Sequence, residues 1–240
     1  MNAIQTHALT RRFKEQTAVD ALELTVPEGE LFALLGVNGA GKTTTIKLLS
    51  GLLAPTSGEA EIFGVSIRSQ KVKHLLAVSP QETAVAPNLT VRENLELMAG
   101  IADASRKEAK ARAEAMLDEA RLREVAEKRA KTLSGGWQRR LSIAMALISE
   151  PKLLFLDEPT LGLDVLARRE LWREIEALKG RITIVLTTHY MEEAEQLADR
   201  VGIMANGKLR VCGTPAELLA LSGKPRFEDA FVALAGGAEV

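Results

Sequence analysis

A glycine-rich segment near residue 40 has the residue types and the spacing that bind phosphate. Its sequence GVNGAGKT, residues 36–43, places three glycines directly before Lys42 and Thr43. Glycine reaches backbone conformations that other residues avoid, so successive N–H groups can point toward one anion. A lysine at this spacing reaches the β- and γ-phosphates of a nucleoside triphosphate, and the adjacent hydroxyl ligates Mg²⁺. The segment predicts an ATP site built from Gly36, Val37, Asn38, Gly39, Ala40, Gly41, Lys42, Thr43 and Thr44.

Carboxylates and a histidine follow two apolar runs later in the chain. Asp157 and Glu158 end the run 153–156, and His189 follows the β-branched run 182–186 and two threonines. In an open α/β sheet, the carboxyl ends of the strands carry the ligand site. We therefore expect Asp157 to hold Mg²⁺, and Glu158 to orient and deprotonate the attacking water. Taken alone, Asp157 and Glu158 are typical of a solvated turn, and an isolated histidine is typically structural. The phosphate-binding segment upstream favours a catalytic role for all three residues.

The elements that must position these residues alternate between strand and helix patterns. Residues 3–9, 18–26 and 31–35 predict strands, and the last of these is continuously apolar, as a buried central strand should be. A helix is predicted from residue 42 to about residue 49, directly after the glycines. Further strands are predicted at 152–157 and 181–188, and a hairpin over 201–211. This alternation indicates an α/β fold with a mostly parallel central sheet.

The middle third of the chain has a different composition. Residues 91–122 are rich in Ala, Glu, Lys and Arg, and 106–122 predict a helix with charges on several sides. Such a helix is typical of a solvated surface. We predict a helical subdomain over about 81–149, inserted between core segments 1–80 and 150–222.

Composition limits the function classes. The 240 residues include 46% hydrophobic and 26% charged residues, as in ordinary globular proteins, and carry a formal charge of −1. Without a basic excess, nucleic acid is not an expected partner. The single Cys212 excludes an internal disulfide and fits a reducing compartment. No secretory signal is visible, and no apolar run approaches the roughly 20 residues that span a bilayer. We expect that the chain itself does not cross a membrane.

A second anion site is predicted in the segment LSGGWQRR, residues 133–140, called here the signature segment. Ser134 should cap a helix that runs to about Ser149, and Gly135 and Gly136 give close backbone access at the positive end of that helix. The segment resembles the signature motif of ATP-binding cassette (ABC) ATPases.

The resemblance covers nearly the whole chain, residues 4–235, and implies one cassette over 1–235 with a short tail over 223–240. It implies a P-loop NTPase core with a mostly parallel central sheet, an N-terminal antiparallel β subdomain and an inserted helical subdomain. By the same resemblance, Phe13 stacks on adenine, Gln81 ligates the metal and senses the γ-phosphate, Asp164 lies in the D-loop, and His189 is the switch histidine. The departures are mild: Phe13 replaces a usual tyrosine, Val37 a frequent proline, and Trp137 a glutamine or methionine.

The family implies a mechanism shared by two chains. Two cassettes pair head to tail, so that Ser134, Gly135, Gly136 and Gln138 of one reach the ATP held by Lys42 of the other. The implied partners are an identical second cassette and separate transmembrane permease subunits. This places the chain peripherally, at the cytoplasmic face of the cell membrane.

The segment THYMEEAE, residues 188–195, resembles cassettes of ABC-2-type exporters, including multidrug, daunorubicin and sodium-efflux systems. Export is therefore the expected direction, whereas the substrate is selected by the membrane subunits. A cassette driving a non-transport process on ribosomes, DNA or iron–sulfur assembly is the first alternative. A nucleotide-dependent scaffold without turnover is the second. A GTPase is disfavoured, because the N-K-x-D base-recognition motif is missing.

Overall fold

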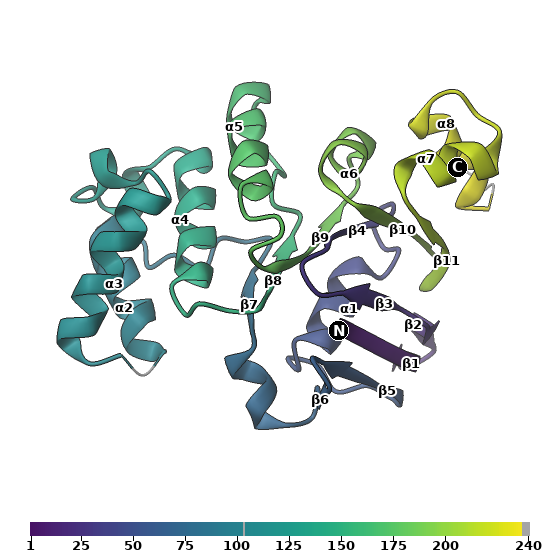
Figure 1. Ribbon diagram of the computed structural model, residues 1–240, viewed down its shortest axis with the longest axis horizontal. Coiled ribbons are helices and arrows are strands. Elements are labelled where there is room, and N and C mark those ends of the chain that lie inside the picture. Colours follow the sequence, from purple (N-terminus) through teal and green to yellow (C-terminus); the bar gives the residue numbers. More distant parts are fainter. Residues whose placement is uncertain (103, 237–240) are drawn as a thin grey trace.

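The computed structural model describes residues 1–102 and 104–236, in which two sheets are flanked by helices (Figure 1). The central sheet has six strands in the order β11-β10-β4-β9-β8-β7. They are β4 (Leu31–Leu35), β7 (Leu76–Ser79), β8 (Leu153–Asp157), β9 (Thr183–Thr188), β10 (Arg200–Ala205) and β11 (Lys208–Gly213). Every neighbouring pair is parallel except β10 and β11, which form the predicted hairpin. The predicted mostly parallel sheet is confirmed.

The second sheet is antiparallel and comes from the N-terminal part of the chain. It contains β1 (Asn2–Phe13), β2 (Gln16–Leu22), β3 (Thr25–Pro27), β5 (Ser57–Ile62) and β6 (Val65–Ser66). The single strand predicted over 18–26 is divided in two, because β2 pairs with the end of β1 whereas β3 pairs with its beginning. The implied antiparallel N-terminal sheet is confirmed.

Helices surround the central sheet and form a lobe at one end of the molecule (Figure 1). They are α1 (Lys42–Leu49), α2 (Val91–Ile101), α3 (Arg106–Glu119), α4 (Gly135–Leu147), α5 (Val165–Glu176), α6 (Met191–Leu197), α7 (Pro215–Ser222) and α8 (Phe227–Leu234). Short 3₁₀ turns occur at Gln70–His74, Arg123–Val125 and Ala130–Thr132. Helix α1 has the predicted bounds. Helix α3 ends before the predicted residue 122, because Arg121 adopts a left-handed backbone with φ +53°.

Three apolar clusters fix how these elements pack. One lies between the N-terminal sheet, α1 and the central sheet; the second covers the other face of the central sheet with α5, α6 and α8. The third lies within the lobe of α2, α3 and α4. Helix α4 contributes Ile143 to the second cluster and Leu141 to the third, so it is the wall shared by the lobe and the core. The proposed subdomain boundaries stay a prediction, and the last four residues of the predicted tail lie outside the described residues.

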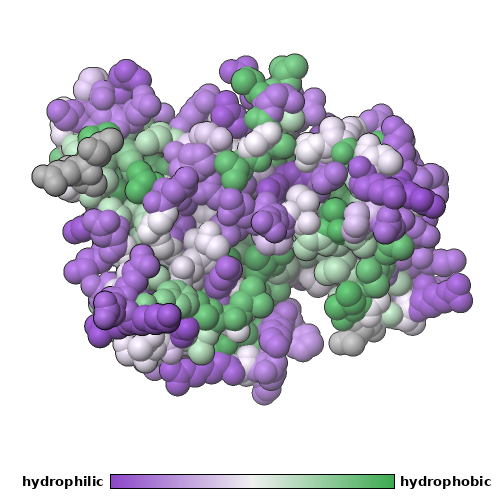
Figure 2. Space-filling model, turned by 180° about the vertical axis from the view of Figure 1, so that it is seen from behind, coloured by the Kyte–Doolittle hydropathy of each residue, from purple (hydrophilic) through white to green (hydrophobic). Residues whose placement is uncertain are grey.

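The surface of the protein carries both hydrophilic and apolar side chains. Figure 2 shows hydrophilic side chains over most of one face, with apolar residues in separate small groups. Leu97 and Ile101 of α2 are among the exposed apolar residues. Across residues 1–102 and 104–236, no helix combines the length and the apolar character needed to span a bilayer.

Candidate active site

The glycine-rich loop joins the end of β4 to the start of α1. Gly41 precedes α1 with φ +106°, and a Cβ added there would lie 2.3 Å from the Ala18 carbonyl oxygen. Gly39 also has a left-handed backbone, with φ +81°, but open space around it. Glycine is thus required at position 41 by both conformation and close approach. The loop delivers its backbone to the positive end of α1, where free N–H groups can bind an anion.

Lys42 lies beneath this loop with only 5% of its side chain exposed. Its Nζ donates to the carbonyl oxygens of Gly36 at 2.7 Å and Val37 at 3.2 Å. The same ammonium pairs with Glu158 Oε1 at 3.1 Å. The charge is therefore fully partnered inside the protein, next to the space that the loop encloses.

Asp157, the last residue of β8, is buried and accepts two hydroxyl hydrogen bonds. Its Oδ1 accepts from Thr187 Oγ1 at 2.6 Å and from Thr43 Oγ1 at 3.1 Å. Asp157 and Thr187 are register partners in the neighbouring strands β8 and β9. Sequence reasoning missed Thr187; its signal was a hydroxyl residue at the carboxyl end of a predicted strand. The Thr187 hydroxyl fixes the orientation of the carboxylate that Thr43 also contacts.

Glu158 follows in a strained backbone conformation. Its φ is +50°, which is unusual for a non-glycine residue, and its N–H donates to Thr187 at both the carbonyl and the hydroxyl oxygen. Its carboxylate lies between Lys42 and His189, with Oε2 at 2.6 Å from His189 Nδ1. The turn thereby aims this carboxylate at the loop.

A cavity of about 530 Å³ opens above these groups. The described residues that line it are Phe13, Gln16, Ala18, Asn38, Gly39, Ala40, Gly41, Lys42, Thr43, Thr44, Gln81, Glu158, Leu161 and His189. The structure therefore brings the predicted loop, Phe13, Gln81, Glu158 and His189 to one cavity, with Asp157 hydrogen-bonded to its wall through Thr43. Sequence reasoning missed Gln16 and Ala18, which carry no motif signal, and it gave Leu161, in the segment 161–164 before α5, no place at the cavity.

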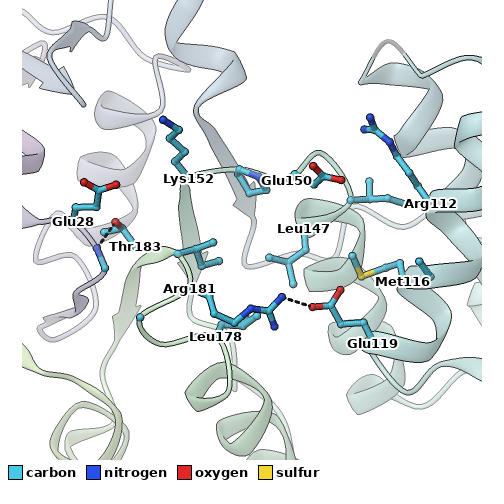
Figure 3. A pocket seen from close by; sticks show the side chains of 16 residues that line it. Glu28, Arg112, Met116, Glu119, Leu147, Glu150, Lys152, Leu178, Arg181 and Thr183 are labelled. Carbon is cyan, nitrogen blue, oxygen red and sulfur yellow. Dashed lines mark hydrogen bonds and ion pairs between the residues drawn. The ribbon is translucent and has the colours of Figure 1, made fainter.

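A larger cavity of about 740 Å³ lies at the other edge of the sheet (Figure 3). It adjoins the amino ends of β8 and β9 through Lys152 and Thr183, and the Arg181–Glu119 ion pair at 2.9 Å crosses it. Its charged side chains have mixed signs, and it lacks a phosphate-binding loop. Because ligands of parallel sheets bind at the carboxyl ends of the strands, the smaller cavity is the candidate site.

The signature segment lies apart from the smaller cavity, which the glycine-rich loop lines. No residue of 133–140 is among the described residues that line it. Ser134 stands at the N-cap position of α4 as predicted, but the prediction that its side chain caps the helix is wrong, since it makes no capping hydrogen bond. The hydroxyl is exposed and left available. Helix α4 ends at Leu147 rather than Ser149, because Glu150, before Pro151, turns to φ +52°.

The segment around Asp164 packs beside the signature glycines. Asp164 Oδ1 accepts from the N–H groups of Leu166 and Ala167, so it caps α5. Cβ atoms added at Gly135 and Gly136 would lie 3.8 Å from Leu163 and 3.3 Å from Ala167. Gln138 Nε2 donates to the Leu133 carbonyl at 3.2 Å. The start of α4 thus packs against the segment that leads into α5, and Ser134, Gly135 and Asp164 are exposed there.

The donor set beside the loop fits Mg²⁺. The Thr43 hydroxyl, the Asp157 carboxylate and the amide of Gln81 are oxygen ligands of the kind that this hard cation prefers. Among the residues described, no group of three or more His, Cys, Asp or Glu side chains could hold a metal alone. Mg²⁺ needs no such group when phosphates and water complete its octahedron.

Comparison with known proteins decides the family. Residues 19–161, more than half of the chain, match the family described as ABC transporter. The chain belongs to the ABC transporter family. Its fold agrees with that of a solved structure described as the ATP-binding subunit of an ABC transporter, with a TM-score of 0.85, 30% identity and coverage of 97% and 99% of the two chains. A dimeric post-hydrolysis ATP-binding cassette bound to ADP and Pi aligns with a TM-score of 0.78, 26% identity, and coverage of 88% and 98%.

Curated relatives of this cassette include transporter proteins from bacteria and plants. The daunorubicin/doxorubicin resistance ATP-binding protein DrrA of Streptomyces peucetius is 41% identical over 90% of this chain and 66% of that protein. The probable multidrug ABC transporter ATP-binding protein YbhF of Escherichia coli is 39% identical over 96% of this chain and 41% of its own length. ABC transporter A family member 9 of Arabidopsis thaliana is 42% identical, and this chain spans 26% of its length. The chain is an ATP-binding cassette.

Proposed function

We propose that this cassette binds ATP with Mg²⁺ and hydrolyses it to ADP and phosphate, and that it powers export through separate transmembrane subunits. The convergence of Lys42, Glu158 and His189 on one cavity carries the proposal, because a phosphate-binding cation, a carboxylate base and a switch histidine are the groups that the chemistry needs. The family match supports the nucleotide and the reaction class.

Each side chain has a role that follows from its contacts. Lys42 exchanges the Gly36 and Val37 carbonyls and the Glu158 carboxylate for phosphate oxygens, which frees Glu158 to accept the proton of the attacking water. His189 holds the other oxygen of Glu158 and reaches the γ-phosphate from the same edge. Phe13, 43% exposed at the rim, stacks on adenine.

Thr43, Asp157 and Gln81 would hold Mg²⁺, which neutralises the charge on the phosphate oxygens when it is bound. Thr187 has an indirect part, since its hydroxyl orients Asp157. Buried contacts therefore prepare the metal ligands before the nucleotide arrives.

The signature residues act on a partner cassette in this proposal. Ser134, Gly135 and Gly136 lie outside the cavity of their own chain at the start of α4, where Ser134 and Gly135 are exposed and Gly136 is half-buried. A second, identical copy placed head to tail would bring them, with Gln138, onto its γ-phosphate, and Asp164 would lie at the same interface. The dimeric cassette among the structural relatives supports this arrangement. ATP then closes the dimer and hydrolysis opens it.

The export direction rests on the relatives named for multidrug and daunorubicin resistance and on the THYMEEAE segment. The cassette would lie peripherally at the cytoplasmic face of the membrane, bound to hydrophobic permease subunits. A cassette that drives a non-transport process is the alternative. Membrane-fraction sedimentation that depends on a co-expressed permease supports the first proposal; sedimentation with ribosomes or nucleic acid supports the alternative.

The dimer model is tested by Ser134→Arg, which places a bulky charge at the free N-terminus of α4. ATP affinity of the monomer should stay within about twofold, whereas steady-state phosphate release should fall about a hundredfold or more, the scale lost with one transition-state anion donor. Ser149→Arg, exposed beyond the other end of α4, is the matched control and should retain turnover. Equal loss of binding and turnover in Ser134→Arg would contradict a site shared by two chains.

A further inference from the structure

The Arg139 side chain joins two parts of the proposed site that lie 58 residues apart in the sequence. Arg139 belongs to α4, the helix that begins with the signature glycines, and its guanidinium contacts the backbone at Gln81. We propose that Arg139 is a positioning residue that couples the placement of Gln81 to the orientation of the signature segment. This inference deepens the proposed function and rests on it.

The contacts are short and buried. Arg139 is 5% exposed, its Nη1 donates to the Pro80 carbonyl at 2.7 Å, and its Nη2 donates to the Gln81 carbonyl at 2.5 Å. Hydrogen bonds from a charged donor are roughly twice as strong as neutral ones. Because both bonds hold the backbone, the Gln81 side chain remains free to line the cavity.

A second buried contact joins the same two elements. Ser142, three residues after Arg139 and on the same side of α4, has its Oγ 2.9 Å from Ser79 Oγ, at the end of β7. The chain that leaves β7 is therefore attached to α4 at two successive points before it enters the lobe. Two attachments prevent α4 from rotating independently of this segment.

Two carboxylates oppose the effect of burial on the pKa of Arg139 without cancelling it. Burial lowers the pKa of the guanidinium, while the carboxylates of Asp157 and Glu193 act in the opposite direction. Asp157 ends the metal-binding strand, and Glu193 lies in α6, just after His189. Arg139 thus joins α4 to the Gln81 segment, and the carboxylates of Asp157 and Glu193 influence its charge from β8 and α6.

The consequence is mechanical. When Gln81 moves to engage the metal and the γ-phosphate, its carbonyl moves the guanidinium, and α4 carries that displacement to Ser134 at its start. Lysine is a poor replacement, since it has no planar fork with two separate nitrogens, of which Nη1 binds the Pro80 carbonyl and Nη2 the Gln81 carbonyl. Arg140 provides a contrast: it points toward α5, pairs with Glu174 at 2.7 Å and stacks over Trp137.

The test uses this chain and three variants, Arg139→Lys, Gln81→Ala and the control Arg173→Lys, which is exposed on α5, with the double variant of Arg139→Lys and Gln81→Ala. Arg139→Lys should keep monomer ATP affinity within about twofold and lower kcat about tenfold to a hundredfold, the equivalent of one charge-assisted hydrogen bond. In the Gln81→Ala background it should cause no further loss of kcat. Arg173→Lys should retain kcat.

Several outcomes would overturn the coupling. These are an unchanged kcat in Arg139→Lys, losses that multiply in the double variant, and a fall in melting temperature that accounts for the lost activity. Gln81→Ala without effect on kcat would also refute it. If the unmodified chain releases no phosphate from ATP, the proposed function fails. If the unmodified chain hydrolyses ATP and Arg139→Lys has the same kcat, the coupling fails and the proposed function stands.

Discussion

Replacing Glu158 by glutamine removes the proposed base and keeps its shape. The variant loses the ion pair of Glu158 Oε1 with Lys42 at 3.1 Å, and the charge opposite His189 Nδ1 at 2.6 Å. An amide cannot accept the proton of the attacking water. We therefore expect steady-state turnover to fall by about 10²–10⁴-fold, the usual contribution of a positioned general base. An ATP-bound dimer should accumulate, because closure still occurs whereas hydrolysis does not.

The same substitution changes stability without nucleotide. At 3.1 Å and an effective dielectric constant of about 20, the Lys42–Glu158 attraction is about 5 kcal/mol before desolvation is counted. Removing one partner of such a pair typically costs about 3 kcal/mol, because the remaining charge stays buried. Saturating ATP should recover much of this loss, since its phosphates supply the missing anion to Lys42.

Three measurements check these expectations: phosphate release, size-exclusion chromatography with ATP, and urea unfolding with and without ATP. Glu176→Gln, on the exposed side of α5, is the control and should match the wild type in all three. Wild-type turnover in Glu158→Gln would refute the assignment of the base. Destabilisation that ATP does not relieve would refute the idea that Lys42 exchanges Glu158 for phosphate.

Three further substitutions probe the loop and a buried acid. Gly41→Ala should abolish ATP binding and lower the melting temperature, because the added Cβ would lie 2.3 Å from the Ala18 carbonyl oxygen. Gly39→Ala should cost only the strain of a left-handed backbone, about 1–2 kcal/mol, because no atom lies near its Cβ. Equal falls in the melting temperature of the two variants would contradict this reasoning. Burial raises the pKa of Glu193, although its hydrogen bonds act in the opposite direction. The folded protein therefore binds the Glu193 proton more tightly than the unfolded chain does. The contribution of Glu193 to the free energy of unfolding falls as the pH rises from the pKa of the unfolded state through the pKa of the folded state. Glu193→Gln should therefore be more stable than the wild type in urea at about pH 7. The difference should vanish at about pH 3, below the ordinary glutamate pKa, where both states are protonated; a difference that persists there would count against burial as its cause.

The sequence alone determined the features that depend on neighbouring residues. The apolar run of β4, the glycines after it and the helix formers from Lys42 onward predict a strand, a loop and a helix whose bounds agree with the structure. The Asn206-Gly207 pair likewise predicts the hairpin that joins β10 and β11. These elements were predictable because local backbone preference and local apolar patterning decide them. The spacing of the motifs was also sufficient to identify the family.

Only the tertiary structure decided how distant residues meet. The register of β8 against β9 places Thr187 on Asp157, and the left-handed turn at Glu158 places its carboxylate between Lys42 and His189, residues more than a hundred positions apart. The bonds from Arg139 to Pro80 and Gln81 likewise depend on how α4 packs between the lobe and the sheet. None of these contacts leaves a periodic or spacing signal in the sequence. They arise because packing fixes side chains that the chain order keeps apart.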